Sequence, residues 1–412
     1  MNVDAINDLL GITEGYQLPD KLLQVLEANE HGAICELLTA QGLEHDLLRD
    51  YFQNEHSDRD KLKQDYTPDC LCSLVAQMTT IDYLDYKPSS IADICAGTGA
   101  LSIALWRLYP DAFFHCEEVA SRVIPVLMLN LCVRNITGEV VRKDILTGEV
   151  FGVWKLSKGT RYSVVTKCNT YEPDFYDVVV SNPPYSIKWK SLYFDICAEF
   201  EFMPNIADYF FLIYCYSLGR IAHLILPHGV LFRGQKEGYC RKRILELNWL
   251  ASIVGVPDNM FLNTSIPVAV LTLEHDKTEN GVLIIDASKG FEKVGKQNVM
   301  TPEHVGKVIE AVRARTDVAK FAKVASFEEI KENDCNLNIP RYVDTFEHEP
   351  TPDLVETLEE LVELNQKIGT TGKELLSFID ELVSTDGMDE RMAKIKALFK
   401  EALRWGGQNG RG

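Results

Sequence analysis

The stretch that decides the fold is Ile91–Gly99, IADICAGTG, in which an apolar run ends in a glycine-rich turn. A helical pattern, LSIALWRL, follows at 101–108. A buried strand, a tight turn and a helix in this order are typical of a doubly wound α/β sheet. Small residues in the turn let the backbone approach a ligand closely, and the amino end of the helix favours a negative group. The stretch therefore predicts a ligand site at the end of this strand.

Seven more apolar runs of strand length recur along the chain, at 112–118, 140–146, 176–182, 221–227, 250–256, 268–274 and 282–288. Strand and helix patterns alternate, and the strands are almost continuously apolar. Both features favour a mostly parallel, Rossmann-like doubly wound sheet with helices on both faces. Residues 148–175 show no clear period, so we expect a long loop there.

The two ends of the chain differ from the middle. Apolar residues at helical spacing in 3–56 predict a small helical N-terminal domain, 1–60, ahead of a catalytic domain, 61–345. In the C-terminal segment, 346–412, apolar residues from 354 to 382 follow the 4,3 spacing of a coiled-coil seam. Because Gly369 and Gly372 interrupt it, we expect two helices joined by a turn at these glycines. The pair could pack within the chain or bind a partner.

Composition excludes several classes of protein. The 412 residues are 46% apolar and 25% charged, which is typical of a globular protein with two or three domains. No run of 18 apolar residues exists, so we expect no membrane span. The acidic N-terminus does not resemble a secretory signal. Eleven cysteines without a CxxC pair indicate reduced thiols, a cytoplasmic location and no metal site, and no P-loop motif occurs.

The net charge of −19 is concentrated in the flanks. Residues 1–60 hold 13 acids and 3 bases, and residues 346–412 hold 14 acids and 8 bases, which leaves −3 for 61–345. If the middle of the chain binds DNA, it lacks the excess of Lys and Arg that would hold DNA alone. A basic partner would then supply much of the affinity. Alternatively, the acidic flanks only confer solubility.

Acidic residues follow the second and third predicted strands. Glu117 and Glu118 end the second, where a carboxylate can bind both hydroxyls of a ribose, and Asp144 ends the third, within reach of an adenine amino group. Because the chain has no GxGxxG motif, S-adenosylmethionine (SAM) fits better than a dinucleotide. The turn residues predicted to bind this cofactor are Asp93, Ala96, Gly97, Thr98 and Gly99.

The fourth strand ends in Ser181 followed by Asn182-Pro183-Pro184-Tyr185. An aromatic amine is a poor nucleophile because its lone pair is delocalised into the ring. The Asn182 side-chain oxygen and the Pro183 carbonyl oxygen can accept hydrogen bonds from the amine and free that lone pair, while the prolines fix the loop. Tyr185 offers a face on which an extruded base can stack. The motif predicts methylation of an exocyclic amino group; the alternative is a proline-stiffened turn.

A further segment precedes a predicted helix at 69–78: Gln64, Asp65, Tyr66, Thr67, Pro68 and Asp69. Thr67 could cap this helix, with Pro68 in its first turn. Alternatively, the Tyr66 ring and the Thr67 backbone could close over the methionine end of the cofactor.

With these motifs, residues 61–345 resemble the modification subunit of type I restriction–modification systems, a gamma-type adenine-N(6) DNA methyltransferase. More specific stretches match that family at 229–234, 258–267, 285–288 and 336–342. The chain departs from the family pattern in its short helical N-terminal region and in Ile94, which stands where proline is usual.

The resemblance implies SAM as cofactor, with residues 64–69 closing over it, residues 93–99 as the glycine motif, Glu118 as ribose acid and residues 182–185 as catalytic motif. It also implies duplex DNA as substrate and assembly of two modification subunits with one DNA-specificity subunit, whose coiled coil the C-terminal helices would contact. A restriction subunit could join them. Two other functions stay open, a protein-glutamine methyltransferase and a catalytically silent SAM-binding scaffold.

Overall fold

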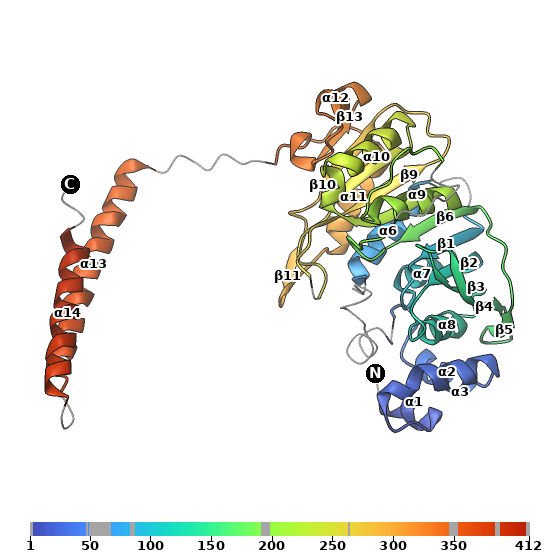
Figure 1. Cartoon of the computed structure of the whole chain (residues 1–412), viewed down its shortest axis with the longest axis horizontal. Coiled ribbons are helices and arrows are strands. Elements are labelled where there is room, and N and C mark those ends of the chain that lie inside the picture. Colours follow the sequence, from blue (N-terminus) through green and yellow to red (C-terminus); the bar gives the residue numbers. More distant parts are fainter. Residues whose placement is uncertain are drawn as a thin grey trace. The chain divides into compact units, whose positions relative to one another are not determined.

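The computed structural model describes residues 3–46, 48, 67–82, 87–190, 198–262, 264–345, 353–383 and 388–408. Contacts divide the chain into two compact units, 1–345 and 346–412, which are described separately below (Figure 1). None of the helices in these ranges combines the length and the apolarity needed to cross a bilayer.

An eleven-stranded sheet forms the centre of the larger unit (Figure 1). In spatial order its strands are β13 (Ala322–Ala325), β10 (Val282–Asp286), β8 (Leu250–Gly255), β9 (Val268–Glu274), β7 (Gly219–Pro227), β6 (Tyr176–Ser181), β1 (Ser90–Ile94), β2 (Phe113–Glu118), β3 (Thr137–Asp144), β4 (Glu149–Ser157) and β5 (Val164–Cys168). All eight strands expected from the sequence are present.

The sheet is mixed rather than mostly parallel. Parallel pairing joins β3, β2, β1, β6 and β7 in the middle of the sheet, and also joins β8 to β10. Strand β9 runs antiparallel to both of its neighbours, β7 and β8. Both edges are antiparallel as well, at β13 and at β4–β5. The predicted parallel core is therefore confirmed, and the antiparallel strands extend it on either side.

The expectation of a loop at 148–175 is wrong, because this segment contains the antiparallel hairpin β4–β5. N-terminal residues stabilise it. The Trp154 Nε1–H donates to Glu27 Oε1 at 2.8 Å. The Asn29 side chain exchanges two hydrogen bonds with the Val165 backbone, at 2.7 and 3.0 Å. The hairpin thus depends on contacts that are remote in sequence.

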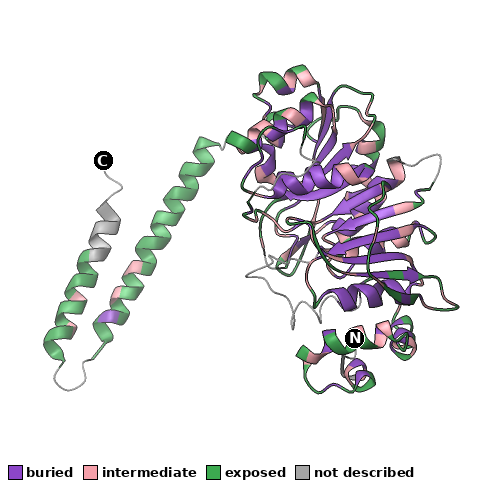
Figure 2. Ribbon diagram, turned by 45° about the vertical axis from the view of Figure 1, so that its right-hand side comes forward, coloured by how far each residue is buried: buried purple, intermediate pink, exposed green. Residues whose placement is uncertain are grey.

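Helices cover both faces of the sheet. One apolar cluster includes α6 (Asp69–Asp82), α7 (Ala100–Trp106), α8 (Ile124–Val133) and α11 (Pro302–Ala314). The other includes α9 (Asp208–Leu218), α10 (Gln235–Glu246) and α12 (Phe327–Glu332). Neighbouring residues of β1, such as Ile91 and Ala92, belong to different clusters because side chains alternate along a strand. The buried sheet lies between these helical layers (Figure 2).

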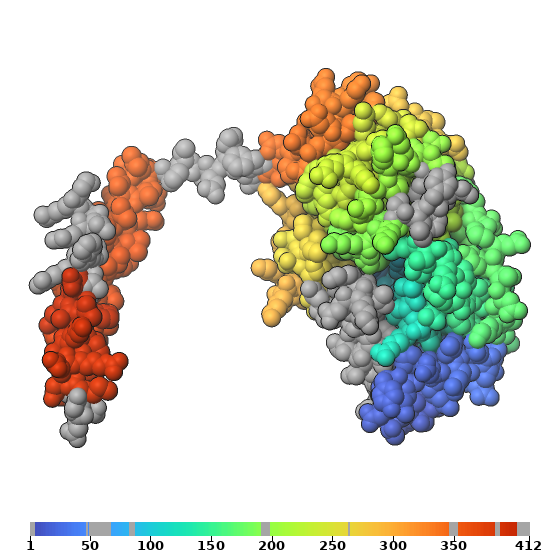
Figure 3. Space-filling model, in the orientation of Figure 1, coloured from blue at the N-terminus to red at the C-terminus, as the bar shows by residue number. Residues whose placement is uncertain are grey.

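Three N-terminal helices, α1 (Val3–Leu10), α2 (Leu18–Glu27) and α3 (Gly32–Thr39), belong to the same compact unit as the sheet. Helices α2 and α3 contact α8, and α2 also contacts β5. Every residue of α8 is buried because the sheet covers one side and the N-terminal helices cover the other. Figure 3 shows the N-terminal helices, in blue, directly against the green residues of the sheet edge.

The smaller unit is a helical hairpin of α13 (Leu354–Glu381) and α14 (Asp389–Gln408). The predicted break at Gly369–Gly372 is wrong, because α13 continues through both glycines. The Lys396 Nζ donates to the Asp380 carbonyl at 2.9 Å across the pair. Of the α13 residues only Ile379 is buried (Figure 2). Large apolar side chains on the hairpin are exposed, among them Leu354, Leu358, Leu361, Ile368, Phe378, Leu398 and Phe399.

Candidate active site

The predicted motifs meet where the strand order reverses. Strand β1 lies between β2 and β6 and is parallel to both. In register, Ile94 at the end of β1 is level with Glu117 on one side and Ser181 on the other. The glycine turn, the acidic pair and the Asn182–Tyr185 loop therefore leave the same edge of the sheet. Doubly wound sheets bind ligands outside the carboxyl ends of their strands at this kind of position.

The glycine turn is tightly folded. Cys95, Gly97 and Gly99 have positive φ angles of 59°, 55° and 92°. A Cβ atom on Gly99 would lie 2.9 Å from Cδ1 of Leu127 in α8. Glycine is thus required at this position both by its backbone angle and by close packing. The turn leads directly into α7, whose amino end faces the same edge.

Asp93 is buried beneath this turn, at 1% exposure. Its Oδ2 accepts hydrogen bonds from the Ser102 backbone N–H at 3.1 Å and the Ser102 hydroxyl at 2.6 Å. Its Oδ1 has no hydrogen-bond partner among the described residues. Burial raises the pKa of Asp93 to about 7, although the Ser102 hydrogen bonds act in the opposite direction. A buried acceptor without a donor is the chemistry that the ammonium group of SAM would complement.

Glu118 faces the glycine turn from the end of β2. Its Oε2 accepts a hydrogen bond from Gly97 N–H at 2.9 Å. Its Oε1 accepts from the backbone N–H groups of Val119 and Ala120, at 2.9 and 2.8 Å. Burial raises the pKa of Glu118, and the three backbone donors counteract this shift. The carboxylate thus lies at the position predicted for the ribose acid.

Glu117 points to the opposite face of the sheet, beneath α9. It accepts hydrogen bonds from Lys143 Nζ at 2.9 Å and from the Tyr214 hydroxyl at 2.8 Å. His115 lies 3.2 Å from it and 2.8 Å from Glu139. Burial alone would raise the pKa of Glu117, but His115 and Lys143 lower it below its usual value. Glu117 therefore belongs to a buried ion cluster, whereas Glu118 belongs to the glycine turn.

Two other predicted cofactor residues lie at the same edge. Ala96 is nearly buried, and its N–H donates to the Glu117 carbonyl at 2.9 Å, which ties the turn to β2. Asp144 ends β3 half-buried, and its Oδ1 accepts a hydrogen bond from Leu146 N–H at 2.9 Å. The Asp144 carboxylate thus also stabilises the turn that follows β3.

Thr98 faces away from the strand end. Its side chain is 1% exposed, and its hydroxyl donates to Asp46 of the N-terminal region. The Asn130 side chain of α8 donates both to the Thr98 carbonyl at 2.8 Å and to Asp46 Oδ1 at 2.9 Å. Asp46 and Asn130 could not be predicted from the sequence, because 52 and 32 residues separate them from Thr98 and no local pattern connects them.

The Asn182–Tyr185 loop starts directly after β6. The Asn182 Nδ2 donates to the Thr67 hydroxyl at 2.9 Å. The Tyr185 hydroxyl donates to Asn182 Oδ1 at 2.6 Å. The Tyr185 ring packs edge-on against Phe261, with 6.2 Å between ring centroids. The amide of Asn182 is therefore held at both of its ends.

Residues 67–69 lie beside this loop, as the Thr67–Asn182 hydrogen bond shows. Thr67 is buried, and the Pro68 carbonyl accepts the first backbone hydrogen bonds of α6. The Asp69 carboxylate lies 3.2 Å from Nδ1 of His45. The other predicted members of this segment, Gln64, Asp65 and Tyr66, lie outside the described residues.

A second group of polar residues supports the loop from its far end. The Ser186 N–H donates to Asp208 Oδ1 at 2.7 Å, at the start of α9. The Arg233 guanidinium donates to Asp208 Oδ2 at 3.0 Å and to the Ser186 hydroxyl at 3.2 Å. Arg233 lies in one of the stretches that carry the family resemblance, but the sequence assigned it no role. Its hydrogen bonds connect Ser186, directly after the loop, to the start of α9.

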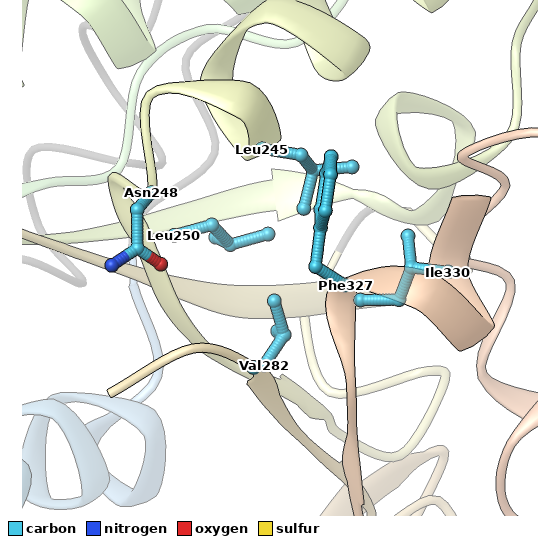
Figure 4. A pocket seen from close by; sticks show the side chains of 7 residues that line it. Leu245, Asn248, Leu250, Val282, Phe327 and Ile330 are labelled. Atoms are coloured by element: carbon cyan, nitrogen blue, oxygen red, sulfur yellow. The ribbon is translucent and has the colours of Figure 1, made fainter. Parts of the chain in front are cut away.

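A small pocket lies elsewhere in the fold (Figure 4). Its lining is mostly apolar and includes Leu250 and Val282, the first residues of β8 and β10, together with Phe327 and Ile330 of the α12 region. It is therefore at the amino ends of the strands, opposite to the edge that holds the motifs. The described residues contain no cluster of three or more His, Cys, Asp or Glu side chains that could bind a metal ion.

Comparison with known proteins agrees with this arrangement. Residues 45–351 match the family described as N-6 DNA Methylase. The chain is 25% identical over 410 residues to the type I restriction enzyme MjaVII methylase subunit of Methanocaldococcus jannaschii, covering 92% of this chain and 69% of that protein. It is 32% identical to the HindI methylase subunit of Haemophilus influenzae, covering 69% of this chain and 65% of the relative. The chain thus spans about two thirds of the length of these relatives.

Among solved structures, the methyltransferase subunit of a type I restriction–modification system from Streptococcus thermophilus is 34% identical, with a TM-score of 0.61 over 68% of this chain and 59% of that one. A structure described for complex assembly of the type I R-M system is 18% identical, with a TM-score of 0.51 over 89% of this chain and 72% of that one, and shows the fold alone. The chain belongs to the N-6 DNA methylase family, whose fold implies the use of SAM.

Proposed function

We propose that the chain transfers a methyl group from SAM to the exocyclic amino group of an adenine in duplex DNA, as the modification subunit of a type I restriction–modification complex. Family membership and the names of the relatives support the reaction. The observation that carries the proposal is the position of Asn182, whose side-chain oxygen lies at the same sheet edge as the glycine turn and Glu118.

The cofactor-binding residues would be those at the ends of β1, β2 and β3. Asp93 offers its unpaired Oδ1 to the ammonium group, and the backbone of Gly97–Gly99 allows close approach. Glu118 would exchange part of its backbone hydrogen bonding for the ribose hydroxyls, and Asp144 would accept from the adenine amine. Bound SAM supplies an electrophilic methyl group on a sulfonium centre.

The target amine would be activated by the Asn182–Tyr185 loop. The Asn182 Oδ1 and the Pro183 carbonyl oxygen accept its two N–H groups, which localises the nitrogen lone pair. The amine nitrogen would form the new N–C bond as the S–C bond breaks, S-adenosylhomocysteine would leave with that electron pair, and the proton of the amine would pass to water. Tyr185 is half-buried at the end of this loop, and its ring would stack on the extruded base. Its hydroxyl shares Asn182 Oδ1 with the substrate, since a carbonyl oxygen has two lone pairs.

Target recognition would belong to a partner. The segment 61–345 carries a net charge of only −3, too little basic excess to bind DNA tightly. The α13–α14 hairpin carries exposed leucines at coiled-coil spacing, which suits docking on the coiled coil of a DNA-specificity subunit. We propose an assembly of two such chains with one specificity subunit, to which a restriction subunit could bind.

The test is incubation of the purified chain with radiolabelled SAM and duplex DNA, with and without a co-expressed specificity subunit. Label recovered as N6-methyladenine, mainly with the partner present, is the expected result. Label on protein glutamine would replace the proposal with a protein methyltransferase. No label under any condition, despite SAM binding, would indicate a scaffold. The Asn182→Ala variant should abolish transfer and leave the SAM dissociation constant within about twofold, because its side chain is assigned to the amine and not to the cofactor.

A further inference from the structure

The segment Leu43–Asp46, between α3 and the catalytic domain, is attached to the back of the glycine turn. The Asp46 carboxylate is buried and accepts hydrogen bonds from the Thr98 hydroxyl and from Asn130 Nδ2, the latter at 2.9 Å. Asn130 Nδ2 also donates to the Thr98 carbonyl at 2.8 Å. Asp46, Thr98 and Asn130 thus form a closed triangle of hydrogen bonds, with all three side chains almost fully buried.

Arg134, one turn further along α8, fixes the backbone of the same segment. Its guanidinium donates to the Leu43 carbonyl at 3.0 and 2.9 Å and to the His45 carbonyl at 2.8 Å. It also donates to the Asn130 carbonyl at 2.7 Å. Burial lowers the pKa of Arg134 to about 10, so the side chain stays charged at neutral pH. The segment is therefore held by a buried cation as well as by Asp46.

The opposite side of the same turn faces Glu118, the residue proposed to bind the cofactor ribose. Gly97 N–H donates to Glu118, and Thr98 follows it directly in sequence. Gly97 is bonded to Glu118 and the adjacent Thr98 is bonded to Asp46. Because the two residues are neighbours in one tight turn, a change in either contact strains the other. The Leu43–Asp46 segment also contacts residues 67–69, since His45 lies 3.2 Å from Asp69.

We propose that Leu43–Asp46 is a positioning segment for the cofactor turn, with Asp46 and Thr98 as positioning residues. Docking of the N-terminal helices sets the geometry of the turn and thereby the affinity for SAM. By thermodynamic reciprocity, SAM binding strengthens the docking of these helices. This inference rests on the proposed function only in naming SAM as the ligand.

The first test measures SAM affinity by isothermal titration calorimetry, without DNA. Thr98→Val keeps the shape of the side chain and removes the hydroxyl donor. We expect the dissociation constant to rise about five- to tenfold for Thr98→Val and for Asp46→Ala, because each removes the buried hydrogen bond between the Thr98 hydroxyl and the Asp46 carboxylate. Thr98→Ser, which retains the hydroxyl, should bind as the unmodified chain does. In a separate DNA methylation assay with a specificity subunit and saturating SAM, kcat of Asp46→Ala should stay within about twofold of the unmodified chain.

Glu36→Gln is the matched control. Glu36 of α3 forms an exposed ion pair with Arg161, at 2.8 Å, which links the N-terminal helices to the β4–β5 hairpin without contacting the glycine turn. This substitution should leave SAM affinity unchanged. The second test is hydrogen exchange of α2 and α3 with and without SAM. We expect SAM to slow exchange in the unmodified chain and in Glu36→Gln, and to have no such effect in Asp46→Ala.

Specific results would overturn the inference. If Thr98→Val and Asp46→Ala lower the thermal unfolding temperature but bind SAM with unchanged affinity, the triangle is only structural. If SAM binds the unmodified chain without slowing exchange in the N-terminal helices, the reciprocal coupling does not exist. If the unmodified chain does not bind SAM, both this inference and the proposed function are refuted, whereas a chain that binds SAM without methylating DNA refutes only the latter.

Discussion

The hydrogen bond between Asn182 and Thr67 indicates that Thr67 orients Asn182 and does not bind the cofactor. The sequence suggests that Thr67 closes over the cofactor or caps a helix. In the structure its hydroxyl accepts a hydrogen bond from Asn182 Nδ2 at 2.9 Å. This contact turns the carbonyl end of the amide towards Tyr185 and away from Thr67. We therefore predict that Thr67→Val, which removes the acceptor and keeps the shape, slows methyl transfer and leaves SAM affinity unchanged.

The size of the effect follows from burial. A buried donor that loses its acceptor costs about 1–3 kcal/mol. Asn182 is only partly buried, so water compensates in part and the lower end of this range applies. A loss of about 1–1.4 kcal/mol in the transition state corresponds to a five- to tenfold lower kcat. Thr67→Ser retains the hydroxyl and should stay within about twofold of the unmodified chain.

The assay is a steady-state transfer of labelled methyl to duplex DNA at saturating SAM in the presence of a specificity subunit, combined with calorimetric titration of SAM. A fall in kcat for Thr67→Val alone, at constant SAM affinity, supports the positioning of Asn182. The reasoning is refuted if Thr67→Val weakens SAM binding and keeps kcat at saturating SAM, because the hydroxyl would then serve the cofactor.

Four further predictions concern the surroundings of the site. The pKa of Asp93 is raised to about 7, so its ionised form should pair with the cofactor ammonium only above that pH. SAM affinity should therefore rise from pH 6 to 8, and Asp93→Asn should remove this pH dependence. Without ligand, the same shift should make the protein less stable as pH rises from about 4 to 7, since the raised pKa favours the protonated folded state; thermal unfolding across this window measures it. Gly99→Ala should weaken SAM binding and lower stability by about 1–2 kcal/mol, through its φ of 92° and its approach to Leu127, as calorimetry and urea unfolding would show. Lys143→Met should destabilise the protein by about 3–5 kcal/mol in urea unfolding, because it removes a cation from the buried Glu117 cluster.

Local sequence predicted the elements that depend on local patterns. The near-continuous apolar runs identified all eight core strands, because a strand covered on both faces needs apolar residues throughout. The β4–β5 hairpin was not predicted from the sequence, because one of its faces is exposed and its stability depends on hydrogen bonds of Trp154 and Val165 to N-terminal residues. The glycines in α13 led to a predicted helix break that the structure does not have. Each costs only about 1 kcal/mol relative to alanine, which a 28-residue helix tolerates.

The site was predictable as far as strand ends define it. Asp93, Glu118 and Asn182 could be located because the carboxyl ends of parallel strands meet at one edge. Which of Glu117 and Glu118 contacts the glycine turn could be read only from the structure, since neighbouring strand residues point to opposite faces and the sequence does not say which face holds the turn. The contacts of Asp46 and Arg233 could not be predicted, because both side chains bond to elements that are distant in the chain.

The exposed apolar stripe of the C-terminal hairpin bears on the fate of the chain in a cell. Helix α13 is about 42 Å long, at 1.5 Å per residue, yet it buries only Ile379. So few internal contacts leave the hairpin prone to local opening. Chains synthesised in excess over their binding partner would expose the apolar side chains of the hairpin to proteases and chaperones. Turnover of orphan chains would then match their abundance to that of the partner, without any transcriptional control.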